Sequence, residues 1–260
     1  MVRTTFLIYI GFEHHCIYCD SKSLCYRIDN FDELTVKINA IKLLKKELQS
    51  RRKKGTIGAG SMSDSYTISE KKYLLTRGCL EVIAQYNYPV HITTKSNLIL
   101  RDLDLLQETN KIYTSIAMTI TTTNDSLASI IEPAAPSPTD RFKALGVLST
   151  LGIRTCITLM PVLPFIEDTD DNIRDIVTKA SYYGVKFIVP WLGMSLRDRQ
   201  RDYYYKCLDK NFPGIREKYQ KRFGDKYYCS DRNMKKLGYT LSNACTNNNI
   251  SLRMPYYEDN

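Results

Sequence analysis

Two cysteines three positions apart, Cys16 and Cys19, form the tightest cysteine spacing in the chain. The stretch 11–20 that contains them directly follows the apolar run 6–10, which places them on a loop at the end of a predicted strand. Three further side chains that can ligate metals are close in sequence, namely His14, His15 and Cys25. Two thiolates at this spacing can bind one metal centre, so the loop predicts a zinc site, a redox pair or part of an iron–sulfur site.

Six apolar, β-branched runs predict the strands that position this loop: 4–10, 56–62, 90–94, 112–122, 155–161 and 185–190. Predicted helices alternate with them over short connections: 30–54 with Asn30 as N-cap, 69–86, 102–108, 138–151 and 171–183. This alternation favours a parallel sheet with crossover helices. No glycine-rich dinucleotide fingerprint follows the first strand. We therefore expect an α/β fold, a partial (β/α)6 TIM-like barrel with a C-terminal helical extension.

The pattern changes after Trp191, where three helices rich in Tyr and Lys are predicted over 197–212, 216–223 and 234–248. We expect the barrel to span 1–196 and a helical extension to span 197–260. The chain carries 37 Lys and Arg against 28 Asp and Glu, a formal net charge of +9. A basic chain is compatible with nucleic acid, although solvated helix faces explain the same charge.

Composition places the chain in a broad class. Its 260 residues are 43% hydrophobic and 25% charged, which is ordinary for a globular protein. No window approaches the ~20 apolar residues of a membrane span, and the run 6–10 is too short for a signal-peptide core. Eight scattered cysteines do not form a secreted disulfide framework, so we expect reduced thiols in the cytoplasm.

Polar or metal-binding side chains follow the first five predicted strands, at 16–19, 60–64, 93–96, 119–123 and 160–164. Because parallel strands of a barrel end at one face, we expect these segments to form one site. Each also has a purely structural explanation. Ser61 and Asp64 suit a turn that caps the next helix, Lys95 suits the surface, and Glu132 and Arg141 suit an ion pair across the loop between them.

The segment 11–26, GFEHHCIYCDSKSLCY, resembles the cluster loop of radical S-adenosylmethionine (SAM) enzymes, and more narrowly the branch related to spore photoproduct lyase. Four further segments resemble motifs of that branch: 58–64, 92–106, 119–142 and 160–169. The resemblance implies a [4Fe–4S] cluster held by three cysteines of a CxxxCxxC loop, with SAM as the second cofactor. Cys16 and Cys19 match the last two cysteines, and Tyr18 matches the aromatic residue before the last one.

The same resemblance implies a SAM pocket. Its residues here would be Tyr18, Ser61, Asp64, Lys95, Thr119, Glu132 and Arg141. The loop after the second strand would lie near the SAM amino group, and Lys95 and Thr119 near its carboxylate and ribose. The implied reaction is reductive cleavage of SAM to methionine and a 5′-deoxyadenosyl radical, which abstracts hydrogen from a substrate. A nucleic-acid lesion is one candidate substrate, and flavodoxin or ferredoxin would donate the electron. No membrane partner is expected.

Phe12 occupies the position of the first cluster cysteine, and its ring offers no lone pair to iron. Three explanations stay open: the cluster is lost, His14, His15 or Cys25 replaces the ligand, or Phe12 is a single-base cloning or sequencing change. Little chain precedes the first strand, which favours a decayed or mis-started gene product. The resemblance thus implies a radical SAM enzyme, lyase-like, or an inactivated relative. The alternative is a non-catalytic degenerate barrel that binds nucleic acid or protein through its basic surface.

Overall fold

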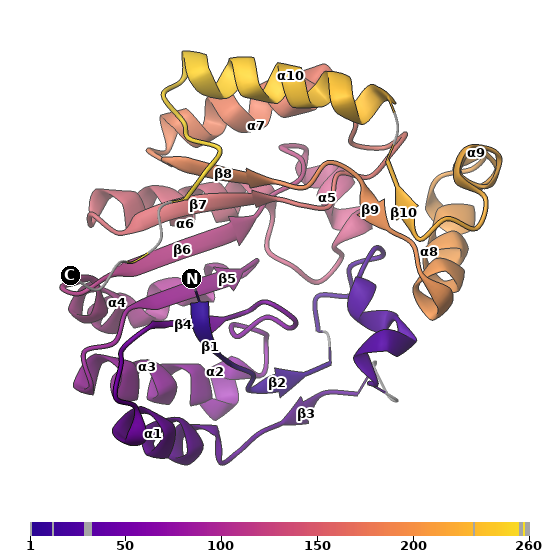
Figure 1. Cartoon of the computed structure of the whole chain (residues 1–260). Helices are drawn as coiled ribbons and strands as arrows, with labels where there is room; N and C mark the ends of the chain where they lie inside the picture. Colours follow the sequence, from indigo (N-terminus) through magenta and orange to yellow (C-terminus); the bar gives the residue numbers. More distant parts are fainter. Residues whose placement is uncertain (1, 12, 29–32, 231, 255–256, 258–260) are drawn as a thin grey trace.

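The computed structural model describes residues 2–11, 13–28, 33–230, 232–254 and 257. Its centre is a six-stranded parallel sheet in the order β1-β4-β5-β6-β7-β8 (Figure 1). The strands are β1 Val2–Phe6, β4 Thr56–Ala59, β5 Val90–Thr94, β6 Thr114–Thr119, β7 Arg154–Leu159 and β8 Phe187–Pro190. Within the described chain no ladder joins β1 to β8, so the sheet is an open, partial barrel. The expected α/β architecture is confirmed.

Helices cover the outer face of the sheet (Figure 1): α1 Ala40–Ser50, α3 Leu75–Gln85, α4 Leu103–Asn110, α6 Pro138–Thr150 and α7 Asp170–Tyr182. Two short helices, α2 Glu70–Tyr73 and α5 Asp125–Ile131, lie in the segments that follow β4 and β6. All six residues of the central strand β6 are buried, as a parallel strand covered on both faces requires. The register pairs Thr94 with Met118 and Thr119 with Thr158, so neighbouring strands end at nearly the same level. The segments after the strands therefore share one rim.

The C-terminal part carries α8 Asp198–Asn211, α9 Ile215–Phe223 and α10 Arg232–Asn247. Figure 1 shows α8 and α9 beyond the arrowheads of the strands, whereas α10 packs against α7. The short strands β9 Met194–Ser195 and β10 Tyr228–Cys229 pair antiparallel and flank α8 and α9. Ser251 hydrogen-bonds to the backbone of Lys186 and Ile188, which covers the edge of β8. A domain boundary at 196/197 stays a prediction.

Two helices predicted from the sequence were wrong in their bounds. The helix expected from residue 30 begins only at Ala40, and Thr35–Val36 form strand β3, paired with β2 Tyr9–Ile10. Ile38, which continued the apolar spacing, is 77% exposed. The predicted N-cap Asn30 lies outside the described residues. The helix expected over 69–86 breaks into α2 and α3 at Leu74, whose backbone is left-handed.

Among the described residues, no helix combines the length and apolar composition that crossing a membrane requires.

Candidate functional site

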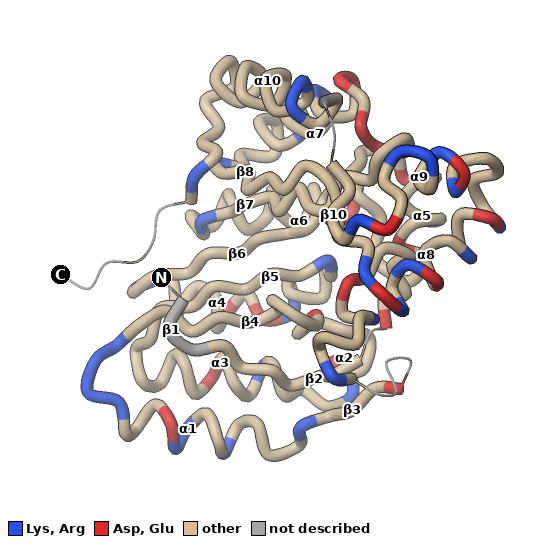
Figure 2. Tube along the Cα trace, turned by 45° about the vertical axis from the view of Figure 1, so that its right-hand side comes forward, with Lys and Arg blue, Asp and Glu red and all other residues tan. Residues whose placement is uncertain are grey.

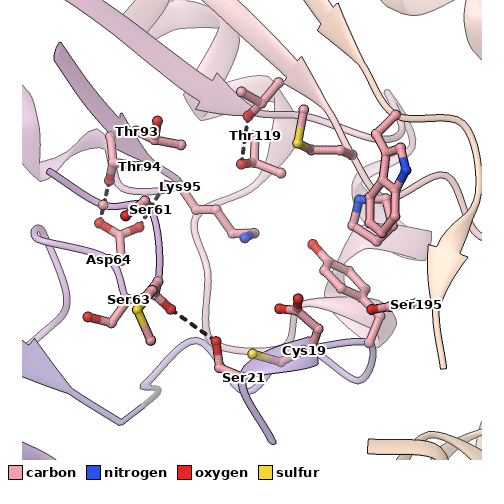
Figure 3. A pocket seen from close by; sticks show the side chains of 18 of the residues that line it. Cys19, Ser21, Ser61, Ser63, Asp64, Thr93, Thr94, Lys95, Thr119 and Ser195 are labelled. Atoms are coloured by element: carbon pink, nitrogen blue, oxygen red, sulfur yellow. Dashed lines mark hydrogen bonds between the residues drawn. The ribbon is translucent and has the colours of Figure 1, made fainter. Parts of the chain in front are cut away.

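A cavity of about 400 Å³ opens at the carboxyl ends of the strands (Figure 3). Its lining combines Cys19 from the cysteine loop, Asp64 after β4, Lys95 after β5, Thr119 at the end of β6 and Ser195 in β9. Figure 3 shows the Lys95 ammonium reaching into the space between the Asp64 side and the Cys19 and Ser195 side. The cavity is thus lined by one thiol, two carboxylates (Asp20 and Asp64), one ammonium and several hydroxyls.

The sequence-predicted site residues divide into two groups. Tyr18, Cys19, Ser61, Asp64, Lys95 and Thr119 all line the cavity. Cys16, Glu132 and Arg141 are buried and do not line it. The structure therefore brings residues from separate segments to one place, which is what the strand-end argument required. Their individual roles toward a cofactor stay predictions.

The cysteine loop is held tightly against the barrel. The Cys19 N–H donates to the carbonyl of Cys16 over 3.3 Å, and the Ile17 N–H donates to the carbonyl of Ile131 at the end of α5 over 2.9 Å. Both cysteine side chains are buried, and burial raises the pKa of each thiol. Each thiol is therefore protonated at neutral pH unless a cation binds it, and a metal must displace those protons.

The donor set for a [4Fe–4S] cluster is incomplete among the described residues. Cys16 and Cys19 supply two thiols, and nowhere in the described chain do three or more His, Cys, Asp or Glu side chains gather in a way that could hold a metal. Phe12, at the position of the third thiolate, lies outside the described residues. The described residues therefore fit two of the three ligands that the loop pattern requires.

Two of the three proposed substitute ligands, His14 and Cys25, are engaged elsewhere. His14 Nε2 lies 2.9 Å from Asp64 Oδ2, within the buried network beside the cavity. Cys25 is exposed, and its Sγ accepts hydrogen bonds from Arg197 Nη1 at 3.1 Å and Ser23 Oγ at 3.3 Å. Neither side chain therefore joins Cys16 and Cys19 in this structure.

Asp64 is the most heavily bonded carboxylate of the site. Its Oδ1 accepts from Thr94 Oγ1 at 2.6 Å and from the Tyr66 N–H at 2.8 Å, and its Oδ2 accepts from the Lys95 N–H at 2.7 Å. Burial opposes ionisation, but the hydrogen bonds and the His14 ring outweigh it and hold the pKa of Asp64 well below its usual range. Asp64 is therefore ionised and fixed by the backbone of the next strand.

A second buried network stands behind the cavity wall. Glu132 pairs with Arg141 and accepts a hydrogen bond from the Tyr18 hydroxyl. Lys95 Nζ lies 4.0 Å from Glu132 Oε1 and 5.8 Å from the centre of the Tyr18 ring. Burial raises the pKa of Glu132, but Arg141 and Lys95 outweigh it and lower the net value. Burial likewise lowers the pKa of Lys95, but carboxylate charges, that of Glu132 among them, act in the opposite direction and the pKa is raised overall. Lys95 therefore faces the cavity as a cation.

Close backbone approach shapes the β4 side of the cavity. Gly60 has φ +85°, and a Cβ there would lie 1.7 Å from the carbonyl oxygen of Thr93. Only glycine lets the loop after β4 reach the end of β5 in this way. That approach places Asp64 beside Thr94 and Lys95, and Asp64 then bonds both residues.

Sequence reasoning missed several residues of the site. Trp191 follows β8 directly and lines the cavity, so the strand-end argument, extended to the sixth strand, would have found it. Met194 and Ser195 also line the cavity, and no sequence pattern marked them. Glu167 is buried next to the site, where its carboxylate accepts from Thr121 Oγ1 at 2.6 Å and the Leu163 N–H at 3.0 Å.

Comparison with known proteins identifies relatives with similar sequences. An uncharacterized protein of Methanocaldococcus jannaschii is 28% identical over 242 residues, which cover 91% of this chain and 88% of that protein. An uncharacterized protein of Mycobacterium tuberculosis is 25% identical over 223 residues, covering 83% of this chain and 65% of that protein. This chain therefore spans less than two thirds of the length of its mycobacterial relatives.

Solved structures share the fold. A spore photoproduct lyase mutant with bound AdoMet and dinucleoside spore photoproduct superposes with a TM-score of 0.71 at 15% identity, covering 94% of this chain and 74% of that one. SuiB of Streptococcus suis bound to its precursor peptide SuiA gives 0.59 at 11% identity, covering 95% and 48%. The family model described as the radical SAM superfamily matches residues 13–179, more than half of the chain. The chain belongs to the radical SAM superfamily.

Proposed function

We propose that the cavity at the strand ends binds S-adenosylmethionine and that Cys16 and Cys19 are two of the three thiolates of a [4Fe–4S] cluster site. The observation that carries this proposal is the meeting of Cys19, Asp64 and Lys95 in one cavity of a radical SAM fold. In this family the bound cluster supplies the electron that cleaves SAM reductively.

Charge complementarity supports the choice of ligand. SAM ends in an amino acid group with a carboxylate and an ammonium. The Lys95 ammonium is the matching partner for a carboxylate, and ionised Asp64 and the hydroxyl of Ser61 provide acceptors for an ammonium or a ribose. Thr119 Oγ1, 2.8 Å from Thr158 Oγ1, adds a hydroxyl pair to the cavity wall. The volume is in the range of cofactor sites in proteins.

The incomplete donor set places a condition on activity. With Phe12 in the loop, the chain binds SAM but holds iron poorly, and a cysteine at this position restores the full cluster site.

A reduced cluster would also need an external one-electron donor, for which flavodoxin and ferredoxin are the candidate classes. The substrate we propose is a nucleic-acid lesion, by analogy with the dinucleoside spore photoproduct bound to the related lyase.

The test compares the chain as given with Phe12→Cys after anaerobic reconstitution. Iron and sulfide content, SAM binding and dithionite-driven SAM cleavage are measured for both. We expect SAM binding by both proteins, and iron uptake and cleavage only by Phe12→Cys. If neither protein holds iron or binds SAM, the proposal is wrong. If the chain as given already holds the cluster, another side chain replaces the third thiolate.

A second candidate function is a non-catalytic barrel that binds nucleic acid. The two-thiol donor set among the described residues and the net charge of +9 favour it. Nucleic-acid binding through a basic surface weakens steeply with salt, because bound phosphates release counterions. Salt-dependent affinity of an iron-free protein that does not bind SAM would support this function over the first.

A further inference from the structure

Trp191 is the single tryptophan of the chain, and it stands at the mouth of the cavity. It follows β8 directly and lines the cavity, yet its side chain is 39% exposed. A large ring that is neither in the core nor fully in solvent, beside a cavity, is typical of a ligand contact.

A second aromatic ring, that of Tyr228, lies beside Trp191. Trp191 precedes α8 in the chain, and Tyr228 follows α9. Tyr228 in β10 stacks on Trp191 with ring centres 5.5 Å apart and planes at 20°. Tyr228 is itself 44% exposed, and its hydroxyl donates to the carbonyl of Leu192 over 3.0 Å. Tyr228 stacks on one face of the indole and does not line the cavity, so the rest of the indole is what Trp191 offers to the cavity.

The backbone holds this pair in place before any ligand arrives. The Trp191 N–H donates to the carbonyl of Leu159 over 3.0 Å. Gly193 has φ +122°, and a Cβ there would lie 2.7 Å from the carbonyl oxygen of Cys229 and 3.0 Å from the Tyr228 hydroxyl. Ordering the rings therefore costs a ligand little conformational entropy.

The segment that joins the two aromatic residues indicates the charge of the ligand. Residues 197–226 contain ten Lys and Arg and five Asp and Glu. Figure 2 shows these charges on α8 and α9, beside β10. A stacking surface next to an excess of cations fits a single-stranded nucleic acid, because its bases stack on aromatic rings and its phosphates pair with cations.

We propose that Trp191 and Tyr228 form the substrate-positioning subsite, where a base of a single-stranded nucleic acid stacks on the open face of the indole at the cavity mouth. This inference rests on the proposed function for the location of the reaction, and it adds the residues that hold the substrate. The exposure of both rings favours a ligand that enters from solvent over one enclosed in the cavity.

The single tryptophan makes the test direct, since its fluorescence reports on the subsite alone. Iron-free protein is titrated with a short single-stranded DNA oligonucleotide, with the same oligonucleotide made abasic, and with SAM. We expect quenching by the base-containing oligonucleotide and little change with the abasic one. Because iron-free protein is used, failure of SAM cleavage does not affect this result, and failure of quenching leaves the cleavage test intact.

Variants separate stacking from general charge. Tyr228→Leu and Trp191→Leu should each weaken affinity for a labelled oligonucleotide about tenfold, measured by anisotropy. Tyr228 does not line the cavity, so Tyr228→Leu should leave SAM affinity unchanged. Tyr228→Phe keeps the ring and should keep the affinity. Tyr239→Leu is the matched control, because Tyr239 is 76% exposed on α10.

Two results overturn the proposal. One is equal binding of the abasic and base-containing oligonucleotides, or binding of neither. The other is a loss of SAM affinity in Tyr228→Leu as large as its loss of oligonucleotide affinity, which would assign the ring to the adenine of the cofactor. If a leucine variant fails to fold, the quenching of the wild-type protein decides.

Discussion

Two buried charge networks flank the barrel, and they differ in what their cations face. In the first, Glu70 and Asp102 are fully buried. Arg101 Nη2 lies 2.7 Å from both carboxylates, and Arg77 Nη1 lies 3.0 Å from Asp102. In the second, which is centred on Glu132, an arginine pairs with the carboxylate and the Lys95 ammonium lies 4.0 Å away, in the cavity wall.

The difference separates a structural network from a binding one. Every carboxylate of the Glu70 network is satisfied by arginines and by the hydroxyls of Tyr9 and Tyr66, and none of these residues lines the cavity. In the Glu132 network Lys95 stays outside hydrogen-bond distance of its carboxylate partner and reaches the cavity. Charges that are fully paired with one another stabilise the fold, whereas a cation held next to a cavity can bind a ligand.

Glu167 is a further buried carboxyl and extends the comparison. Within the described chain its carboxylate accepts from a hydroxyl and a backbone N–H, with no cation among these partners. Burial, helped by the charges of Glu132 and Asp168, raises its pKa to about 8. Glu132, which has an arginine partner, shows the opposite direction of pKa shift. The arginine partner of Glu132 thus accounts for the opposite directions of the pKa shifts of these two buried glutamates.

The largest expected loss of stability comes from a substitution in the Glu70 network. Glu70→Ala removes one partner and leaves Arg101 and the Tyr9 hydroxyl without it, so the free energy of unfolding should fall by about 3–5 kcal/mol in urea denaturation. Asp104→Ala is the control, because Asp104 pairs with Arg77 at 2.7 Å but is 58% exposed, and its loss should cost less than about 1 kcal/mol. Equal losses would refute the assignment of Glu70 to a structural network.

Lys95→Met tests the role of the Glu132 network in binding. SAM affinity should fall about tenfold or more, because a charge-assisted contact contributes roughly 1.5–3 kcal/mol. The free energy of unfolding should change by only about 1 kcal/mol, since Arg141 still pairs with Glu132. Isothermal titration calorimetry and urea denaturation give the two values. Lys111→Met, at an exposed helix end, is the matched control. Unchanged SAM affinity with a large loss of stability would make Lys95 a structural residue.

Glu167 predicts a pH dependence of stability. The folded state holds its proton up to a pKa of about 8, whereas an unfolded carboxyl releases it near pH ~4.3. This carboxyl therefore stabilises the fold least above pH 8, and the free energy of unfolding falls between these two pKa values, by at most ~1.4 kcal/mol per pH unit.

Glu167→Gln should flatten that slope in urea denaturation between about pH 5 and pH 8. Glu108→Gln, a half-exposed carboxyl on α4, should leave it unchanged. The same slope in wild type and Glu167→Gln would show that Glu167 is ionised throughout this range.

The smallest expected effect is at the hydroxyl pair of the cavity. Thr119→Val removes the hydrogen bond to Thr158 with little change of shape, and thermal unfolding should report a loss of about 1 kcal/mol. SAM affinity should fall less than in Lys95→Met, because a neutral hydroxyl contributes less than a charge. A larger fall than in Lys95→Met would make the hydroxyls, rather than the ammonium, the main recognition group.

Local patterns in the sequence determined much of this molecule. The alternation of apolar strands and amphipathic helices predicted the parallel open barrel, and the polar segments after the strands predicted which residues would meet. Both depend on periodicity and on the geometry of parallel sheets, which short stretches of chain carry by themselves. The helix expected from residue 30 failed because its apolar spacing ran through an extended segment. Thr35–Val36 form β3 there, and Leu34 and Val36 pack against the core.

Only the tertiary structure decided the contacts between distant segments. Tyr18 meets Glu132 across 114 positions, His14 meets Asp64 across 50, and the Trp191–Tyr228 stack forms where β9 and β10 pair. It also shifts the pKa values of Glu132 and Glu167 in opposite directions, although both are buried glutamates. The physical reason is that a pKa, an ion pair or a ring stack depends on which groups surround a side chain, and residues far away in the chain supply those groups.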